Sequence, residues 1–214
     1  MAYDRDAIVG CLKRHYDLLV RMAYLNPTTI QEPPPSGWSD DQLAIDILRA
    51  MGRSEKVIDL LRHLPYLHET KHYDEDIHIY PETMAISYRN DTGWFRGQTA
   101  ESCQGKTLGY LCLMPFEEDC PPGFISLTYG NLATDWIIDI DEGVMFASDG
   151  NIVDANVPED QPWRRGGKPR DIKDYFDEVY FDMVSLKVVP APPAGRWGPA
   201  IIYGEGPEGQ VRCT

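Results

Sequence analysis

Basic residues are scarce in this sequence of 214 residues. The chain holds 20 Lys and Arg against 34 Asp and Glu, which gives a formal net charge of −14 at pH 7. A surface with this charge repels the phosphates of nucleic acids and of anionic lipids at long range. We therefore expect neither nucleic acid nor a membrane as a partner, and a basic protein becomes the favoured kind of partner.

Long apolar runs and paired cysteines are missing as well. The longest apolar stretch, residues 108–116, is too short to span a bilayer, and residues 1–10 lack the basic region and apolar core of a signal peptide. The five cysteines include no CxxC pair, and their odd number fits reduced thiols better than a disulfide framework. These absences together predict a cytoplasmic protein.

Apolar residues are nevertheless abundant enough for a folded core, at 43% hydrophobic and 11% aromatic. In the first part of the chain they recur at helical spacing. Asp4 and Ser54 are candidate N-caps, and residues 39–42 have the form of a capping box. The spacing predicts three helices, at residues 4–25, 40–51 and 54–64.

Beyond residue 77 the pattern changes to short runs rich in β-branched and aromatic residues, separated by Pro, Gly, Asn and Asp. A helical stripe then follows at residues 171–186, with Asp171 as a candidate cap. Prolines and a glycine-rich tail end the periodicity, so residues 196–214 are expected to form a draped or mobile arm. The short runs predict six strands, at residues 77–80, 83–89, 107–114, 124–129, 135–140 and 144–148.

The order of these elements, helices first, then strands, then one helix, predicts an α+β fold. We expect an antiparallel sheet with its helices grouped on one side. The sequence also suggests a division into an N-terminal helical extension (residues 1–53), an α+β domain (residues 54–190) and a C-terminal arm (residues 191–214). No internal repeat is present.

An acidic hairpin joins the last two predicted strands. Residues 141–143, Asp-Glu-Gly, are typical of a tight hairpin loop. In the strand before the loop, side chains alternate between the two faces of the sheet, so Trp136 points to the core and Asp139 to the other face. We therefore expect Asp139 and Asp141 on the solvent side or at the hairpin tip. The surrounding residues 101–163 hold 12 acidic residues and one basic residue, so most of the net charge lies here.

Four segments resemble the SUKH superfamily, which includes bacterial toxin-immunity proteins and a fungal regulator of cell-wall synthesis. Residues 57–65 (VIDLLRHLP) are similar to that family's amphipathic helix ending in Leu-Pro. Residues 122–128 (PGFISLT) and 135–143 (DWIIDIDEG) are similar to its strand, hairpin and acidic turn, and residues 171–186 to its closing helix. The resemblance, over about residues 57–186, implies a domain without catalysis that holds a protein partner on a variable surface.

Tryptophans in predicted loops complete the candidate binding surface. Each of them stands beside Gly, Pro or Arg, and exposed aromatics in loops favour binding sites. Such a residue more often packs under its own loop, so both roles stay open. The predicted binding residues are the loop aromatics and the hairpin acids: Trp38, Trp94, Asp139, Asp141, Glu142 and Trp163.

An H-E-x-x-H string at residues 68–72 (HETKH) offers an alternative. On a helix, His68 and His72 would lie one turn apart and could share a zinc ion, with Glu69 as the general base on a bound water. The same string also fits a solvated loop, because residues 71–76 are polar all round. The solvated loop is the interpretation we favour.

These patterns together favour a non-enzymatic SUKH-type domain that binds a basic protein through its acidic hairpin and loop aromatics. Under this interpretation we expect no catalytic residue, metal or cofactor. The first alternative is a zinc-dependent hydrolase that uses His68, Glu69 and His72. The second is a metal-free enzyme of small-molecule metabolism, with a pocket between helices and sheet lined by Tyr, His and Asp. The sequence leaves the oligomeric state open.

Overall fold

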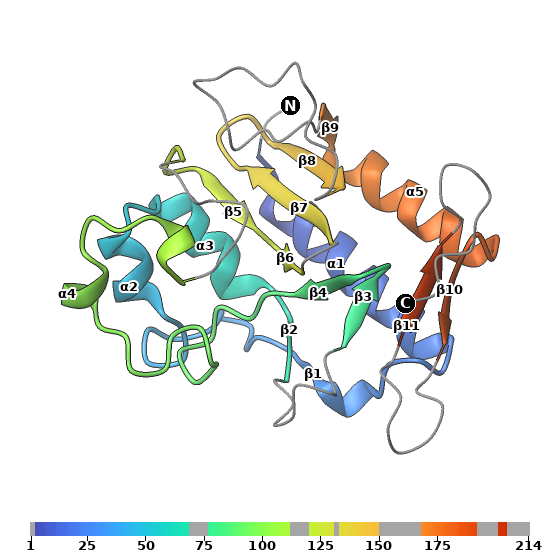
Figure 1. Ribbon diagram of the computed structural model, residues 1–214, viewed down its shortest axis with the longest axis horizontal. Coiled ribbons are helices and arrows are strands. Elements are labelled where there is room, and N and C mark those ends of the chain that lie inside the picture. The colour runs from blue at the N-terminus through green and yellow to red at the C-terminus, as the bar shows by residue number, and fades with distance from the viewer. Residues whose placement is uncertain are drawn as a thin grey trace.

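The computed structural model describes residues 3–68, 77–111, 120–130, 133–149, 168–191 and 201–204. These residues form an α+β fold, as the sequence predicts (Figure 1). Their helices are α1 (Arg5–Arg21), α2 (Ile45–Ala50), α3 (Glu55–His63), α4 (Ala100–Cys103) and α5 (Ile172–Val184), with 3-10 turns at Pro27–Thr29 and Leu108–Leu111. Their strands are β1 (Ile30–Gln31), β2 (Tyr66–Leu67), β3 (His78–Tyr80), β4 (Thr83–Ala85), β5 (Phe124–Ser126), β6 (Thr128–Tyr129), β7 (Thr134–Asp139), β8 (Val144–Asp149), β9 (Pro169–Asp171), β10 (Val188–Ala191) and β11 (Ile201–Gly204).

Three helices begin at the caps that the sequence predicts. The side chains of Asp4, Ser54 and Asp171 each accept a hydrogen bond from a backbone N–H in the first turn of α1, α3 and α5, respectively. A capping side chain satisfies an N–H that helix geometry leaves without a partner. Because this chemistry is local, the sequence alone locates these helix starts.

Helix α2 is shorter than predicted. The expected capping box closes a turn instead, in which the side-chain oxygen of Gln42 accepts hydrogen bonds from the N–H and the hydroxyl of Ser39. Leu43 then forms an antiparallel bridge with Arg89. The bridge holds Leu43 outside the helix, so α2 begins only at Ile45.

Seven of the described strands form an antiparallel sheet in two joined parts, while β1 with β2 and β10 with β11 make separate two-stranded sheets. Strands β5, β7, β8 and β9 make a four-stranded part in that order, and β3, β4 and β6 make a three-stranded part. The segment that carries β5 and β6 belongs to both. Its Leu127 donates from the backbone N–H to the carbonyl of Trp136 and accepts, at its own carbonyl, from the N–H of Ile86. The hairpin between β7 and β8 closes at the pair Asp139 and Val144, as the sequence predicts.

Two segments differ from their predictions. Residues 108–111, predicted as part of a strand, form a 3-10 turn, because an apolar run of this length fits either structure. The C-terminal arm, predicted as draped or mobile, contains β11, which pairs antiparallel with β10. In this pairing Val188 lies opposite Gly204, and Ala191 lies opposite Ile201. Strand β10 contains two Val and β11 contains two Ile, and these β-branched residues favour sheet once a partner strand is present.

Helices α1 and α5 pack against each other and cover the sheet at β7 (Figure 1). Trp136 of β7 is completely buried there. Its ring makes edge contacts with His15 of α1, at 5.4 Å between ring centroids, and with Phe176 of α5, at 5.1 Å. Arg14 of α1 also pairs with Asp177 of α5, at 2.5 Å. The first and last long helices of the described chain are therefore held together by apolar and ionic contacts.

The N-terminal helical extension shares one hydrophobic core with the residues that follow it. Ile8, Leu12 and Leu19 of α1 are buried in the same cluster as Val57 of α3 and Trp136 of β7. Such a shared core couples the stability of the two segments, because neither buries its apolar face alone. The domain boundaries at residues 53 and 190 stay a prediction.

Candidate functional site

The acidic hairpin forms, but Asp139 does not face solvent. The residue is only 5% exposed, and its Oδ1 accepts hydrogen bonds from the N–H groups of Asp141 (3.0 Å) and Glu142 (3.1 Å). Burial raises the pKa of the Asp139 carboxyl, and the two N–H donations oppose that rise. The prediction of a solvent-facing Asp139 is therefore wrong, because the carboxylate folds back to satisfy the backbone of its own turn.

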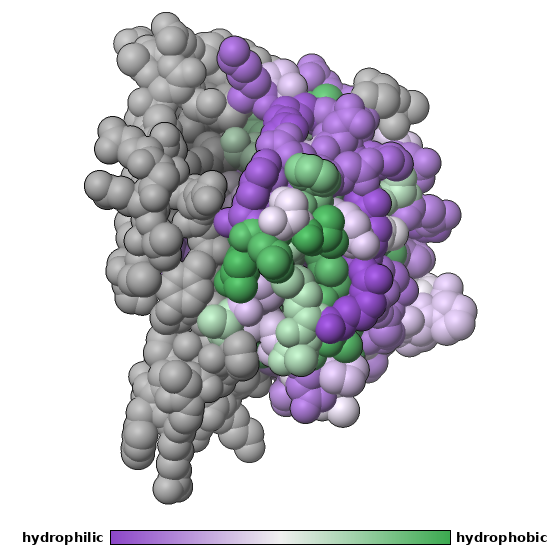
Figure 2. Space-filling view, turned by 90° about the vertical axis from the view of Figure 1, so that its right-hand side faces the viewer, coloured by the Kyte–Doolittle hydropathy of each residue, from purple (hydrophilic) through white to green (hydrophobic). Residues whose placement is uncertain are grey.

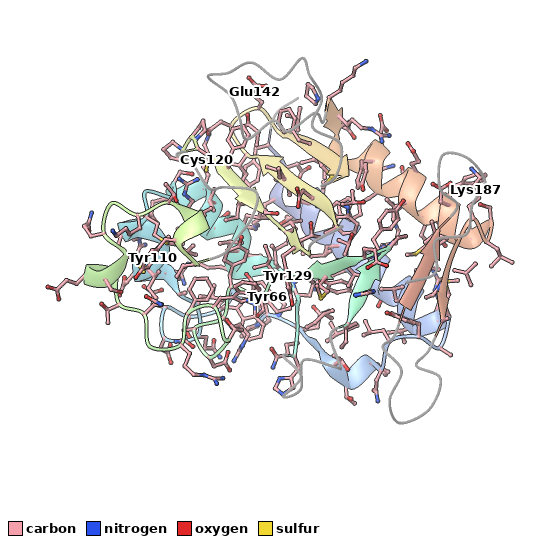
Figure 3. The ribbon with its side chains drawn as sticks, viewed as in Figure 1. Tyr66, Tyr110, Cys120, Tyr129, Glu142 and Lys187 are labelled. Carbon is pink, nitrogen blue, oxygen red and sulfur yellow. The ribbon has the colours of Figure 1, made fainter. Side chains whose placement is uncertain are left out.

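Asp141 and Glu142 are both exposed at the hairpin tip. The carboxylate of Asp141 pairs with the ammonium group of Lys56 on α3, at 2.8 Å. It also lies over Gly123, where a Cβ atom would come within 2.4 Å of its Oδ2. Glu142 lies at the tip of the β7–β8 hairpin (Figure 3), and its carboxylate makes no hydrogen bond or ion pair with any residue in the described ranges. Of the three hairpin acids, Glu142 is thus the one available to a ligand.

Beside this hairpin lies an open depression with a volume of about 450 Å³. It is bounded by the start of α1, by the β7–β8 turn at Gly143 and by the start of α5. Three carboxylates face it, so we call it the acidic depression. The described residues that line it are Asp4, Ala7, Ile8, Gly143, Asp171, Ile172, Lys173 and Asp174.

Two of the lining carboxylates are helix caps. Asp4 and Asp171 each use one oxygen, Oδ1, to accept a backbone N–H at the start of α1 or α5, and the dipoles of both helices favour negative charge there. The second oxygen of each carboxylate can accept a hydrogen bond from a ligand. Asp174 adds a third carboxylate, while the ammonium group of Lys173 is paired with Asp177. The described part of the lining, with three carboxylates and one ammonium group, therefore carries net negative charge.

Sequence reasoning missed this site, although it identified Asp4 and Asp171 as candidate caps. The two caps become neighbours only because α1 packs along α5 and because β9, which precedes α5, pairs with β8. Pairings between segments so far apart in the chain leave no local signal. The acidic residues near both helix starts are the one trace of the site in the sequence.

The lining suits an organic cation. Within the ranges that the structure describes, no three His, Cys, Asp or Glu side chains gather closely enough to hold a metal ion. An ammonium or guanidinium group instead reaches separate carboxylates through several N–H donors, and such charge-assisted hydrogen bonds are strong. The acidic depression can thus receive the end of a lysine or arginine side chain.

Trp38 and Trp94 are not among the described residues that line the acidic depression. Trp38 is buried, donates from Nε1 to the carbonyl of Leu64 at 2.9 Å, and carries the guanidinium of Arg89 over its ring at 4.8 Å. Trp94 is half-buried and packs edge-on against Tyr129, with 4.8 Å between centroids. Both tryptophans therefore pack under their own loops. Trp163 lies outside the described residues.

The H-E-x-x-H string begins at the end of a strand. The N–H of His68 donates to the carbonyl of Thr29 at 2.8 Å, which extends the pairing of β1 with β2 by one residue. Its Nδ1 lies 3.3 Å from the side-chain nitrogen of Gln31. In this position at the end of β2, the side chain of His68 is exposed, and the residue lies outside any helix. Glu69 and His72 lie outside the described residues, so the zinc alternative stays a prediction.

Comparisons with known proteins identify no relative. No family model matches the chain, and no curated protein and no solved structure matches it. The resemblance to the SUKH superfamily therefore enters the functional argument as a proposal. Among the helices of the described ranges, none combines the length and the apolar composition needed to cross a bilayer.

Proposed function

We propose that this protein is a non-enzymatic binding domain of the SUKH type, and that it docks a basic protein at the acidic depression and the adjacent hairpin tip. One observation carries the proposal. Three carboxylates, those of Asp4, Asp171 and Asp174, converge on a single depression beside Glu142, whose carboxylate has no partner among the described residues.

The electrostatics of the chain support this choice of partner. A formal net charge of −14 attracts a basic protein at long range, and carboxylates in a concave site concentrate that attraction. Charge complementarity of this kind mainly accelerates association and weakens as salt rises. The alternative of a metal-free enzyme predicts a pocket lined by Tyr, His and Asp, and among the described residues that line the depression only Asp is of these three types.

The test uses a double variant that removes charge without removing a helix cap. Glu142→Gln with Asp174→Asn eliminates one carboxylate at the hairpin tip and one in the depression. The probe is a fluorescein-labelled octa-arginine peptide, and fluorescence anisotropy at about 50 mM NaCl measures its Kd. We expect the Kd to rise about thirtyfold in the double variant, because two lost charge-assisted contacts at roughly 1 kcal/mol each weaken binding by about 2 kcal/mol.

The matched control is Asp17→Asn with Glu101→Gln, which makes the same change in net charge at exposed positions elsewhere. Asp17 lies about 20 Å along α1 from Asp4. We expect the control to change the Kd less than about twofold. Equal weakening by both double variants would mean that the peptide responds to net charge alone and would overturn the proposal. A Kd unchanged between about 50 and 300 mM NaCl would overturn it as well.

A further inference from the structure

An apolar patch lies at the end of α5 away from the acidic depression. Figure 2 shows it as green surface with hydrophilic residues beside it. Phe181 is 58% exposed and Leu186 is 66% exposed, and these values are high for side chains of this size. The patch exposes on the order of 400 Å² of apolar surface, the size at which the largest patch of a monomer is often functional. Its members, which we call the α5 patch, are Phe181, Val184, Leu186 and Val189.

Leu186 occupies a position where the fold would favour glycine. It follows the last turn of α5 with a φ of +63°, in the left-handed region. Its N–H donates to the carbonyl of Met183, and the N–H of Lys187 donates to the carbonyl of Asp182, which is the hydrogen-bond pattern of a helix end that usually carries Gly. A leucine here adds backbone strain and, being exposed, adds little burial to the fold. Its side chain is therefore better explained by a contact outside the molecule.

The outer face of α5 changes character along its length. Asp174, Glu178, Phe181 and Val184 follow one another at spacings of three or four residues, so they lie on one side of the helix, and all four are exposed. The first two are acidic and the last two are apolar. Asp174 also lines the acidic depression, so the acidic end of this stripe continues the proposed binding site.

We infer that the outer face of α5 binds one amphipathic segment of the basic partner. Cationic side chains of that segment meet Glu142 and Asp174 at one end, and its apolar side chains cover the α5 patch at the other. This inference rests on the proposed function and specifies what the partner presents. From Asp174 to Val184 the stripe is about 15 Å long, which a helix of about ten residues spans.

Charge and area both favour such a partner over a second copy of this chain. Two copies with a formal charge of −14 repel each other, whereas a basic segment is attracted. A stable protein pair buries about 800 Å² on each side, roughly twice what the α5 patch offers. An amphipathic segment needs less area, because a few apolar anchors in a patch supply most of its binding energy.

The experiment selects a phage-displayed library of random 16-residue peptides on the immobilised full chain. We expect enriched peptides to combine Lys or Arg with apolar residues one helical turn apart. Their Kd should rise at least about tenfold on Phe181→Ser with Val184→Ser, and change less than about twofold on Tyr110→Ser, an exposed aromatic elsewhere. Enriched peptides that bind the double variant as tightly as the native chain would overturn the inference, as would the absence of any enrichment.

Two further measurements separate binding from folding and from the proposed function. Leu186→Gly relieves the left-handed strain, so we expect it to raise the Tm while it weakens peptide binding. Weaker binding together with a lower Tm would show a structural defect and would count against the inference. The enriched peptides could instead carry Lys and Arg without apolar residues, with a Kd that rises on Glu142→Gln with Asp174→Asn but not on Phe181→Ser. That result would leave the proposed function intact and overturn this inference. Self-association in sedimentation runs that Phe181→Ser abolishes would also overturn it.

Discussion

His15 is an ionisable side chain in the apolar contact between α1, α5 and the sheet. It is almost completely buried, and its Nε2 lies 2.7 Å from the carbonyl of Ile79, to which it donates. Burial lowers the pKa of His15 to about 4, although the hydrogen bond to Ile79 opposes the shift. The ring therefore stays neutral in the folded protein at pH values where the unfolded chain already binds a proton.

This difference predicts how stability depends on pH. Between the folded pKa of about 4 and the ordinary value of 6.5, the unfolded state binds more protons than the native state, so the free energy of unfolding must fall as pH falls through that window. We expect a loss of about 3 kcal/mol over the window from this group. Urea unfolding of the native chain and of His15→Gln between pH 4 and pH 7.5 measures it. A native profile as flat as that of the variant would contradict the prediction.

Asp139 shows why alternation along a strand places some side chains wrongly. Alternation correctly places Trp136 in the core, because both faces of a strand are determined by the backbone. It fails at Asp139, the last residue of β7, because the face of the strand opposite Trp136 is buried as well: Asp135 is 4% exposed and Ile137 is 0% exposed. The buried carboxylate of Asp139 bonds the backbone of the following turn instead of water. Such a bond competes with solvent exposure and depends on turn geometry rather than on the period of the strand.

The β7–β8 hairpin depends on that same carboxylate. Asp139→Ala leaves the N–H groups of Asp141 and Glu142 without their acceptor, so we expect the free energy of unfolding to fall by about 1–2 kcal/mol. Asp139→Asn keeps an oxygen acceptor and should cost less than half as much. Urea unfolding at pH 7 measures both. If the two variants lose equal stability, the charge of Asp139 rather than its acceptor oxygen holds the turn.

Elements with local signals could be predicted, and elements that need a distant partner could not. Helices α1, α3 and α5 carry both an apolar stripe and a capping side chain, and each begins at its predicted cap. Strand β11 is too short to be recognised without β10 beside it. The acidic depression belongs to the second kind, because it exists only where the starts of α1 and α5 meet the β7–β8 turn.

The excess of acidic residues acts on the whole molecule. With 34 acidic and 20 basic residues, the folded chain concentrates like charges that the unfolded chain spreads apart. Raising NaCl from about 20 to about 200 mM should therefore raise the Tm by about 2–4 °C, even as it weakens the proposed partner complex. Thermal unfolding followed by circular dichroism measures the shift. A Tm that falls with salt would mean that exposed ion pairs such as Lys56–Asp141 outweigh the repulsion.

The packing of α1 on α5 also bears on how the chain folds while it is being made. Helix α1 leaves the ribosome before α5, which follows about 150 residues later, and this separation corresponds to roughly 8–30 s of translation. During that time the apolar stripe of α1, with Ile8, Leu12 and Leu19, has no α5 to cover it. Closure of the core therefore waits for the last long helix of the described chain.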